Sequence, residues 1–304
     1  MKYRIGVDIG GTTVKLAAVD ENFKLYDKSR FSTGEGCTSE SIVQGIIDHC
    51  RPLIEKYDVE AIGIGSAGTI DSKNGIAVSA GNLPFRNEPV VAKVQTALGI
   101  PTFIDNDGTC ALIGEKTAGA CKGYEDSVII TIGTGIGGAI LIGDRVVRGH
   151  NNRAGELGHF VIDRNGIKCE CGLHGCFEQY ASATALINKT TVAAAAYPSS
   201  ILAKLCRENG IEGKTVFDAK EQGCPIAIGL LDEYGRILAD GLNSLVHIFQ
   251  PQVIAISGGV SRQGDALLEL VRPHMFKQCK VVTSSLLGDG GIIGAALLGT
   301  EHAR

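Results

Sequence analysis

The chain has 304 residues, of which 44% are hydrophobic and 20% are charged, and its formal net charge is −4. This composition supports a large apolar core in one large domain or two smaller ones. Lysines and arginines do not cluster together with aromatic residues, so nucleic acid is not an expected partner.

The beginning of the chain does not read as a secretory signal, because Asp8 interrupts the first apolar run. The longest uncharged run, 127–143, approaches the length of a membrane helix, but it contains five glycines and alternates like two strands. We therefore expect a cytoplasmic protein that has no membrane partner.

The first half of the sequence alternates between strand and helix patterns. Apolar spacing predicts strands over 3–9, 14–18, 24–31, 60–65 and 102–104, and helices over 38–57, 88–98 and 108–118. Pro89 suits the first turn of its helix, where a missing backbone N–H costs little.

The second half restarts with the same plan of strand, glycine turn and strand. The pattern predicts strands over 128–132, 139–142 and 253–257 and at Val281, and helices over 178–189, 225–249 and 265–276 and from Ile292. Hairpin strands followed by helical crossovers indicate an α/β fold with mixed sheets. We predict two similar lobes that enclose a cleft.

Two glycine turns, 10–13 and 133–138, each join two predicted strands. The second matches the dinucleotide pattern G-x-G-x-x-G, but that pattern must open a helix and here a strand follows, which argues against a nicotinamide cofactor. Such turns can direct backbone N–H groups at a polyphosphate, although each alone is also an ordinary hairpin turn. Asp8 would repel that phosphate unless Mg²⁺ lies between them, and a turn-stabilising Asp is the alternative.

Ten cysteines divide into two groups. Seven are scattered through apolar segments, as buried cytosolic thiols would be: Cys37, Cys50, Cys110, Cys121, Cys206, Cys224 and Cys279. The other three, Cys169, Cys171 and Cys176, are spaced Cys-x-Cys-x₄-Cys. They predict a tetrahedral structural zinc site whose fourth ligand is His159 or His174, and reduced thiols without a metal are the alternative.

Five motifs carry a family resemblance: DIGGTTVK at 8–15, DND at 105–107, TIGTGIGG at 131–138, GELGH at 155–159 and CECGLHGCFEQYAS at 169–182. With them the chain resembles the ROK family of sugar kinases and repressors, and within it the bacterial glucokinases. The resemblance implies a two-lobed actin-like (ribonuclease H-like) ATPase fold. It implies a small lobe, 1–118 plus 291–304, and a large lobe, 119–290, that carries the zinc loop and the nucleotide site.

The resemblance implies ATP-dependent phosphorylation of a free hexose, in the first place glucose at its 6-hydroxyl, with Mg²⁺ and a structural Zn²⁺. It also implies a homodimer or homotetramer. The alternatives are an N-acetylmannosamine, N-acetylglucosamine or fructose kinase and, in other classes, a sugar-sensing regulator without turnover or an actin-type filament protein. Repressors of the family carry a helix-turn-helix module before the first motif, and because that motif begins here at Asp8, we expect the kinase branch.

The resemblance also assigns the site residues, with Asp107 as the general base. The implied sugar ligands are Asn82, Asn106, Asp107, Glu156, His159 and Glu178. The implied nucleotide ligands are Asp8, Gly10, Gly11, Thr12, Thr134, Gly135, Gly258 and Gly259, and the implied zinc ligands are His159, Cys169, Cys171 and Cys176. By local sequence alone, Asp107 is a helix N-cap, and the alternatives are a surface turn for Asn82 and a plain strand-to-helix turn for Gly258 and Gly259. Lys15 is left outside the site.

Overall fold

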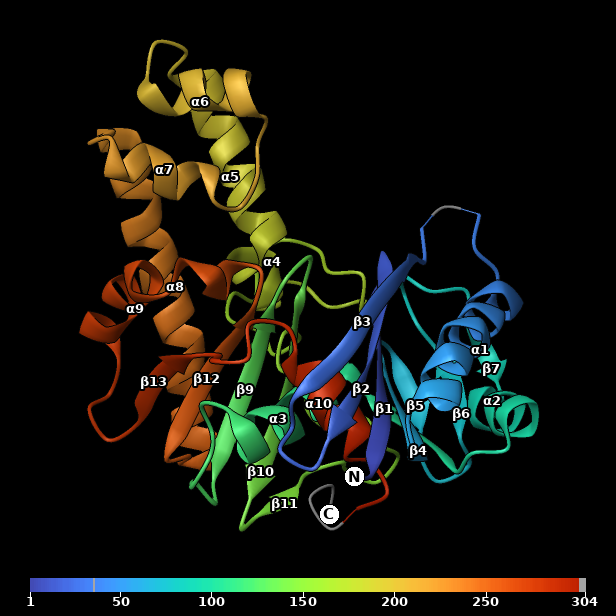
Figure 1. Ribbon diagram of the computed structural model, residues 1–304. Helices are drawn as coiled ribbons and strands as arrows, with labels where there is room; N and C mark the ends of the chain where they lie inside the picture. The colour runs from blue at the N-terminus through green and yellow to red at the C-terminus, as the bar shows by residue number, and fades with distance from the viewer. Residues whose placement is uncertain (35, 301–304) are drawn as a thin grey trace. The chain divides into compact units, whose positions relative to one another are not determined.

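The computed structural model describes residues 1–34 and 36–300 (Figure 1). The chain divides into two compact units. The first unit contains Met1–Glu125, Ala139–Gly155 and the segment from Gly288, and the second contains Asp126–Gly138 and Glu156–Leu287. The lobe boundaries expected from the sequence stay a prediction. Within the described residues, no helix is both long enough and apolar enough to span a bilayer.

Two five-stranded mixed sheets share one strand order, β3-β2-β1-β4-β8 and β11-β10-β9-β12-β13, and β5-β6-β7 form a smaller antiparallel sheet. The strands are β1 (Tyr3–Ile9), β2 (Thr13–Asp20), β3 (Leu25–Ser32), β4 (Val59–Ser66), β5 (Thr69–Asp71), β6 (Ile76–Ser79), β7 (Arg86–Glu88), β8 (Thr102–Asn106), β9 (Ser127–Ile132), β10 (Ile136–Ile142), β11 (Arg145–Val146), β12 (Val253–Gly258) and β13 (Lys280–Thr283). In both large sheets the central strand is followed by two parallel strands, β1-β4-β8 and β9-β12-β13. The predicted repeat and the predicted α/β class are thus confirmed.

The helices connect and cover these sheets. They are α1 (Ser39–Lys56), α2 (Val90–Leu98), α3 (Asp107–Ala118), α4 (Glu178–Ala181), α5 (Ala183–Ala196), α6 (Ile201–Asn209), α7 (Thr215–Glu221), α8 (Pro225–Phe249), α9 (Asp265–Val271) and α10 (Gly290–Ala296), with 3₁₀ turns at Val260–Gln263 and Arg272–His274.

Several predicted boundaries were wrong for local reasons. The helix predicted over 178–189 is two helices, because Ser182 ends α4 and its hydroxyl accepts a hydrogen bond from the backbone of Ala185, which caps α5. The helix predicted from residue 88 begins at Val90, so Pro89 precedes it instead of occupying its first turn. The strands β5 to β7 are too short to produce a clear alternating pattern.

In the first unit, one face of the β3-β2-β1-β4-β8 sheet is buried under α1 and α2. Ile5, Val7 and Ile9 alternate along β1 and join Ile42 and Ile46 of α1 in one apolar cluster. Strand alternation therefore sends the even-numbered residues of β1, among them Asp8, to the opposite face of the sheet.

That opposite face is covered by α10, which packs beside α3 (Figure 1). The approach is close, because a Cβ at Gly63 of β4 would lie 1.7 Å from the carbonyl oxygen of Ala295, and one at Gly6 of β1 would lie 1.9 Å from that of Ile292. Glycine on the sheet is therefore what allows α10 to rest on β1 and β4. The same packing brings the start of α10 to Asp8.

In the second unit, α8 is the central helix. Leu231, Leu238 and Leu245 recur every seven residues along its buried face. Tyr234 on the same helix is fully buried, and its hydroxyl donates a 2.8 Å hydrogen bond to the carbonyl oxygen of Ala181, at the end of α4. This contact fixes the short helix that begins at Glu178.

Candidate active site

In the first unit, acidic residues gather at the carboxyl ends of parallel strands. The strand register pairs Asp8 of β1 with Gly65 of β4, and pairs Gly65 with Asp105 of β8. Asp107 begins α3 directly after β8. The carboxyl ends of parallel strands are where open α/β sheets bind ligands, so these carboxylates lie where a site is expected.

Asn106 caps α3, so the local interpretation of Asp107 as the N-cap is wrong. The Asn106 Oδ1 accepts hydrogen bonds from the backbone N–H groups of Gly108 at 2.8 Å and Thr109 at 3.2 Å. Its Nδ2 donates to the carbonyl oxygen of Gly68 at 3.2 Å. Capping therefore does not fall to the Asp107 carboxylate, which begins the first turn of the helix.

Asp8 is a carboxylate with an altered proton affinity. Burial raises the pKa of Asp8 to about 6, with Lys15 lowering it and the charge of Asp107 raising it. Lys15, which was left outside the predicted site, faces Asp8 across the hairpin, with Nζ 3.9 Å from Oδ2. Hairpin register, which pairs the two residues, is the signal that could have found it.

The surroundings of Asp8 fit a divalent cation. A Cβ at Gly291, near the start of α10, would lie 3.1 Å from the Asp8 carboxylate, so the chain approaches that side chain closely. Two neighbouring carboxylates, Asp8 and Asp107, repel each other in their ionised forms. Mg²⁺, with carboxylate and water ligands, would offset this repulsion.

The first glycine turn lies against Asn82. Gly10 closes the turn by donating its N–H to the carbonyl oxygen of Thr13 at 3.1 Å. A Cβ at Gly11 would lie 3.1 Å from Cβ of Asn82, in the loop between β6 and β7. The structure thus brings Gly10, Gly11, Thr12 and Asn82 together, as expected for one site.

The second glycine turn joins β9 to β10, which begins at Ile136, earlier than predicted. The Ile136 N–H donates to Glu178 Oε2 at 3.3 Å. A Cβ at Gly135 would lie 2.5 Å from the same oxygen, so a larger residue there would displace the Glu178 carboxylate. Thr134, at the tip of the turn, is exposed to solvent.

Gly258 lies beside the start of this turn. It pairs in register with Ile132, the last residue of β9, and a Cβ on it would lie 2.4 Å from the Ile132 carbonyl oxygen. Its φ of 88° also requires glycine. Gly258 therefore ends β12 beside the turn that contains Thr134 and Gly135, and the two predicted nucleotide-binding segments of the second unit are neighbours.

The structure brings His159, Cys169, Cys171 and Cys176 into one cluster, with one ligand atom of each within 4.8 Å of all the others. Cys169 Sγ lies 3.6 Å from His159 Nδ1, and Cys171 Sγ lies 3.5 Å from Cys176 Sγ. Tetrahedral zinc with bonds of about 2.0 to 2.3 Å needs ligand atoms roughly 3.5 to 3.8 Å apart. The cluster fits a structural zinc ion with all four positions filled by the protein.

His174 is not part of this cluster. Its ring is exposed, and Nδ1 lies 3.4 Å from the carbonyl oxygen of Gly166. Of the two histidines that the spacing left open, His159 is the one the fold places among the thiols.

Two of the three thiols resist ionisation while no metal is bound. Burial, with hydrogen bonds from the neighbouring thiols, raises the pKa of Cys176 to about 12, and burial raises the pKa of Cys169. A hydrogen bond from the Leu173 backbone N–H lowers the pKa of Cys171. Three thiols this close do not all ionise unaided, so a divalent metal would displace their protons and bind the thiolates.

Glu178 connects this cluster to the glycine turn. Its Oε1 lies 3.3 Å from Cys169 Sγ and 3.4 Å from His159 Nδ1, while Oε2 accepts from Ile136. Sequence reasoning placed Glu178 among the sugar ligands but missed these three contacts. Glu156 is exposed, and its carbonyl oxygen accepts a hydrogen bond from the His159 N–H at 3.1 Å.

The ROK family matches residues 4–302 of this chain. Glucokinases from Streptomyces coelicolor and Thermotoga maritima are each 34% identical to it, over 99% and 98% of this chain and 98% and 97% of their own lengths. The crystal structure of a ROK family glucokinase from Streptomyces griseus in complex with glucose and AMPPNP is 36% identical, with a TM-score of 0.87, and the match covers 97% of this chain and 98% of that one. These matches, together with the zinc cluster and the two glycine turns, identify the chain as a member of the ROK family.

Proposed function

We propose that this protein transfers the γ-phosphoryl group of ATP to the 6-hydroxyl of glucose. The observation that carries the proposal is the match along 97% of the chain to a glucokinase crystallised with glucose and AMPPNP. Curated glucokinases at 34% identity over nearly the full length support the same activity. These similarities confirm the predicted ATP-dependent hexokinase activity, which implies Mg²⁺ as well.

Asp107 acts as the general base. It accepts the proton of the sugar hydroxyl as that oxygen attacks the γ-phosphorus, and ADP leaves. Its place supports the role, because Asn106 caps α3 and fixes the backbone on which Asp107 sits. The Asn106 amide and Asn82 bind sugar hydroxyls near this base.

The glycine turns hold the nucleotide. Backbone N–H groups of the turns at 10–12 and 134–135 bind phosphate oxygens, and 258–259 let the chain approach the adenosine closely. Asp8 would hold Mg²⁺ through water, with Lys15 beside it. When bound, Mg²⁺ would neutralise negative charge on the phosphates.

The zinc cluster orders the sugar ligands of the second unit. Glu156, His159 and Glu178 bind sugar hydroxyls, and two of them contact the cluster directly, His159 as a ligand and Glu178 at 3.3 Å from Cys169 Sγ. A site with four protein ligands leaves no position for a reactive water, so the zinc is structural. The predicted homodimer or homotetramer and the cytoplasmic location are parts of the same proposal, and light scattering after gel filtration tests the assembly.

The test is an ADP-release assay on the zinc-loaded protein over glucose, mannose, fructose, N-acetylglucosamine and N-acetylmannosamine. Glucose should give the highest kcat/KM, and the product should carry phosphate on O6. Asp107→Asn serves as the control for background hydrolysis of ATP. Turnover of an N-acetylhexosamine or of fructose with glucose inert would replace the substrate, and absence of ADP release with every sugar would reject the kinase.

A further inference from the structure

Asp105 is a buried carboxylate next to the proposed base. It lies near the end of β8 and is 4% exposed. A carboxylate removed from water in this way is stable only with hydrogen bonds and a nearby positive charge. Asp105 therefore places a buried carboxylate two residues before Asp107.

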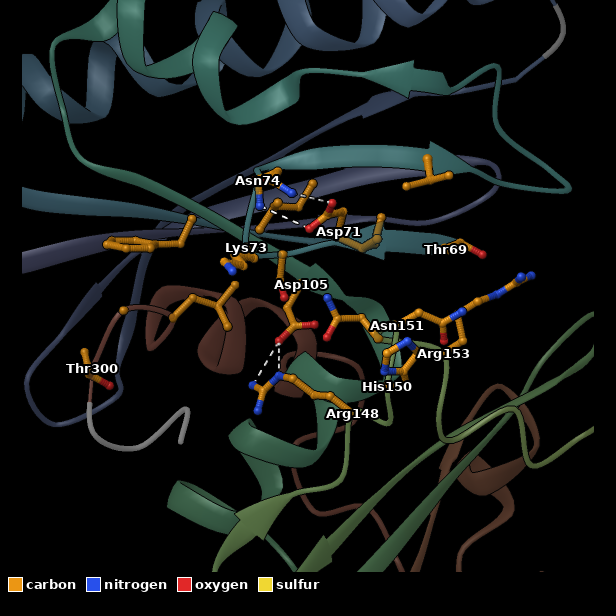
Figure 2. A pocket seen from close by; sticks show the side chains of 18 residues that line it. Thr69, Asp71, Lys73, Asn74, Asp105, Arg148, His150, Asn151, Arg153 and Thr300 are labelled. Carbon is orange, nitrogen blue, oxygen red and sulfur yellow. Dashed lines mark hydrogen bonds and ion pairs between the residues drawn. The ribbon is translucent and has the colours of Figure 1, made fainter.

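Arg148 supplies the positive charge. Its Nε lies 3.0 Å and its Nη2 2.9 Å from Asp105 Oδ2, and Figure 2 shows the guanidinium directed at that carboxylate. The two residues are 43 positions apart in the sequence, so the pair ties the segment after β11 to the end of β8. Charge-assisted hydrogen bonds of this kind are the strong ones.

The second oxygen of Asp105 holds the backbone that leads to Asp107. Asp105 Oδ1 accepts the Asn106 N–H at 2.8 Å. Asn106 Oδ1 in turn accepts the N–H groups of Gly108 and Thr109. Asp107 is therefore fixed between two residues whose backbone N–H groups are both held by side chains.

We propose that Arg148 is a positioning residue for catalysis, acting through Asp105 to fix the backbone that presents Asp107 to the sugar hydroxyl. The inference rests on the proposed role of Asp107. Arg148 orients the Asp105 carboxylate. If Arg148 is removed, the carboxylate can turn, and its hydrogen bond with the Asn106 N–H then shifts. Displacing a catalytic group by about 1 Å costs on the order of 100-fold in rate.

A cavity of about 860 Å³ makes this proposal testable by chemical rescue. It is lined by Arg148 and Asp105 together with the turn that contains Lys73 and the segment 150–153 (Figure 2). The Arg148 side chain is 25% exposed, so solvent reaches the guanidinium. An Arg148→Ala variant opens a space beside Asp105 that free guanidinium ion can enter from this cavity.

The experiment measures kcat, and KM for glucose and ATP, in Arg148→Ala and Arg148→Lys. The Ala variant should lose about 100-fold in kcat, with both KM values within about twofold, because an interaction made for the transition state is lost. The Lys variant should lose roughly tenfold, because an ammonium keeps the charge without the planar fork. Guanidinium chloride, far below concentrations that unfold proteins, should restore about tenfold of the turnover of the Ala variant.

Two controls separate positioning from stability and from the proposed chemistry. Lys73→Ala removes a positive charge from the same cavity without touching Asp105, and should keep its turnover and not respond to guanidinium. Asp107→Asn should be inactive and not rescued. An active Asp107→Asn would refute the base itself, whereas an inactive one beside a fully active Arg148→Ala would refute only the positioning role.

A folded Arg148→Ala protein, judged by cooperative thermal unfolding, with kcat within about twofold of the parent would overturn the inference. A rise in KM with unchanged kcat would also overturn it. So would a failure of guanidinium to raise the kcat of Arg148→Ala. Should the Ala variant fail to fold, the Lys variant decides by the same kinetics, and parental kcat in that variant rejects the proposal.

Discussion

Two regions that carry predicted site residues, one in each unit, are held together by different forces. The DND segment, taken as 105–109, joins β8 to α3, and it is fixed by hydrogen bonds from its backbone N–H groups to side chains and by one ion pair. The zinc loop, 156–177, lies wholly within the described residues and contains no helix or strand. Its only regular pairings there are the isolated bridges Val161–Cys176 and Lys168–His174. A segment with so little regular structure needs another source of order, and the cluster of His159 with three thiols provides it.

The largest expected change in free energy comes from the loss of zinc from the zinc loop. Structural zinc contributes roughly 10–16 kcal/mol of apparent binding free energy in peptides of this kind, so Cys171→Ser should release the metal and disorder the loop. Glucose KM should rise and turnover fall at least about tenfold, because His159 and Glu178 lose their support. Hydrogen exchange should increase over the zinc loop and leave the DND segment protected.

Cys206→Ser is the matched control, because it removes a half-buried thiol in α6, outside the cluster. This variant should retain zinc, and its KM for glucose should equal that of the parent protein. If Cys171→Ser behaves like Cys206→Ser, the comparison between the two regions is wrong.

The two histidines give a second, smaller effect within the zinc loop. His159→Ala removes a ligand and should lower zinc affinity by more than about tenfold, whereas the exposed His174 can be replaced without loss of metal. Metal analysis after dialysis measures both. Zinc lost from His174→Ala and kept by His159→Ala would reverse the assignment of the fourth ligand.

Near the DND segment, Asp8 makes stability depend on pH. Its folded pKa of about 6 lies above the ordinary Asp value of 3.8, so the native state binds the proton more tightly than the unfolded state. The free energy of unfolding should therefore fall by up to about 3 kcal/mol as pH rises through this interval, and remain reduced above it.

Asp8→Asn should remove this loss. Without Mg²⁺ and nucleotide, it should stabilise the protein by about 1–3 kcal/mol near pH 8 and hardly at all below about pH 4, while ATP turnover falls. Urea unfolding across the pH range measures the difference. Equal destabilisation at both ends of the range would show that folding does not raise the pKa of Asp8.

The smallest effect concerns the cap of α3. Asn106→Ala removes the acceptor for two backbone N–H groups and should cost about 1 kcal/mol of unfolding free energy. Asn106→Asp keeps the acceptor and should cost less, so the pair separates capping from the hydrogen bond to Gly68. Equal losses in the two variants would assign the effect to the Gly68 contact.

Much of the fold follows from local patterns. Alternation predicted the β1–β2 hairpin, the 3.6-residue spacing of Ile42, Ile46 and their neighbours predicted α1, and the spacing of three cysteines predicted the metal cluster. These features depend on residues near one another in the chain, where periodicity carries the signal.

The rest depends on contacts that no local pattern contains. Arg148 and Asp105 meet across 43 residues, and nothing near either residue indicates its partner. The cap at Asn106 was missed because Asn and Asp compete for adjacent positions and both favour capping. Glu178 was expected in the sugar site, but its approach to Cys169 depends on how the zinc loop folds back.

The most direct test of the account is Asp107→Asn, with turnover and glucose binding measured on the same preparation. We expect kcat to fall by about 10²–10⁴ while calorimetry gives a glucose Kd within a few-fold of the parent, because a lost general base impairs the chemical step and leaves sugar binding in place. Near-parental kcat in this variant would contradict the role of Asp107, and with it the proposed mechanism of glucose phosphorylation.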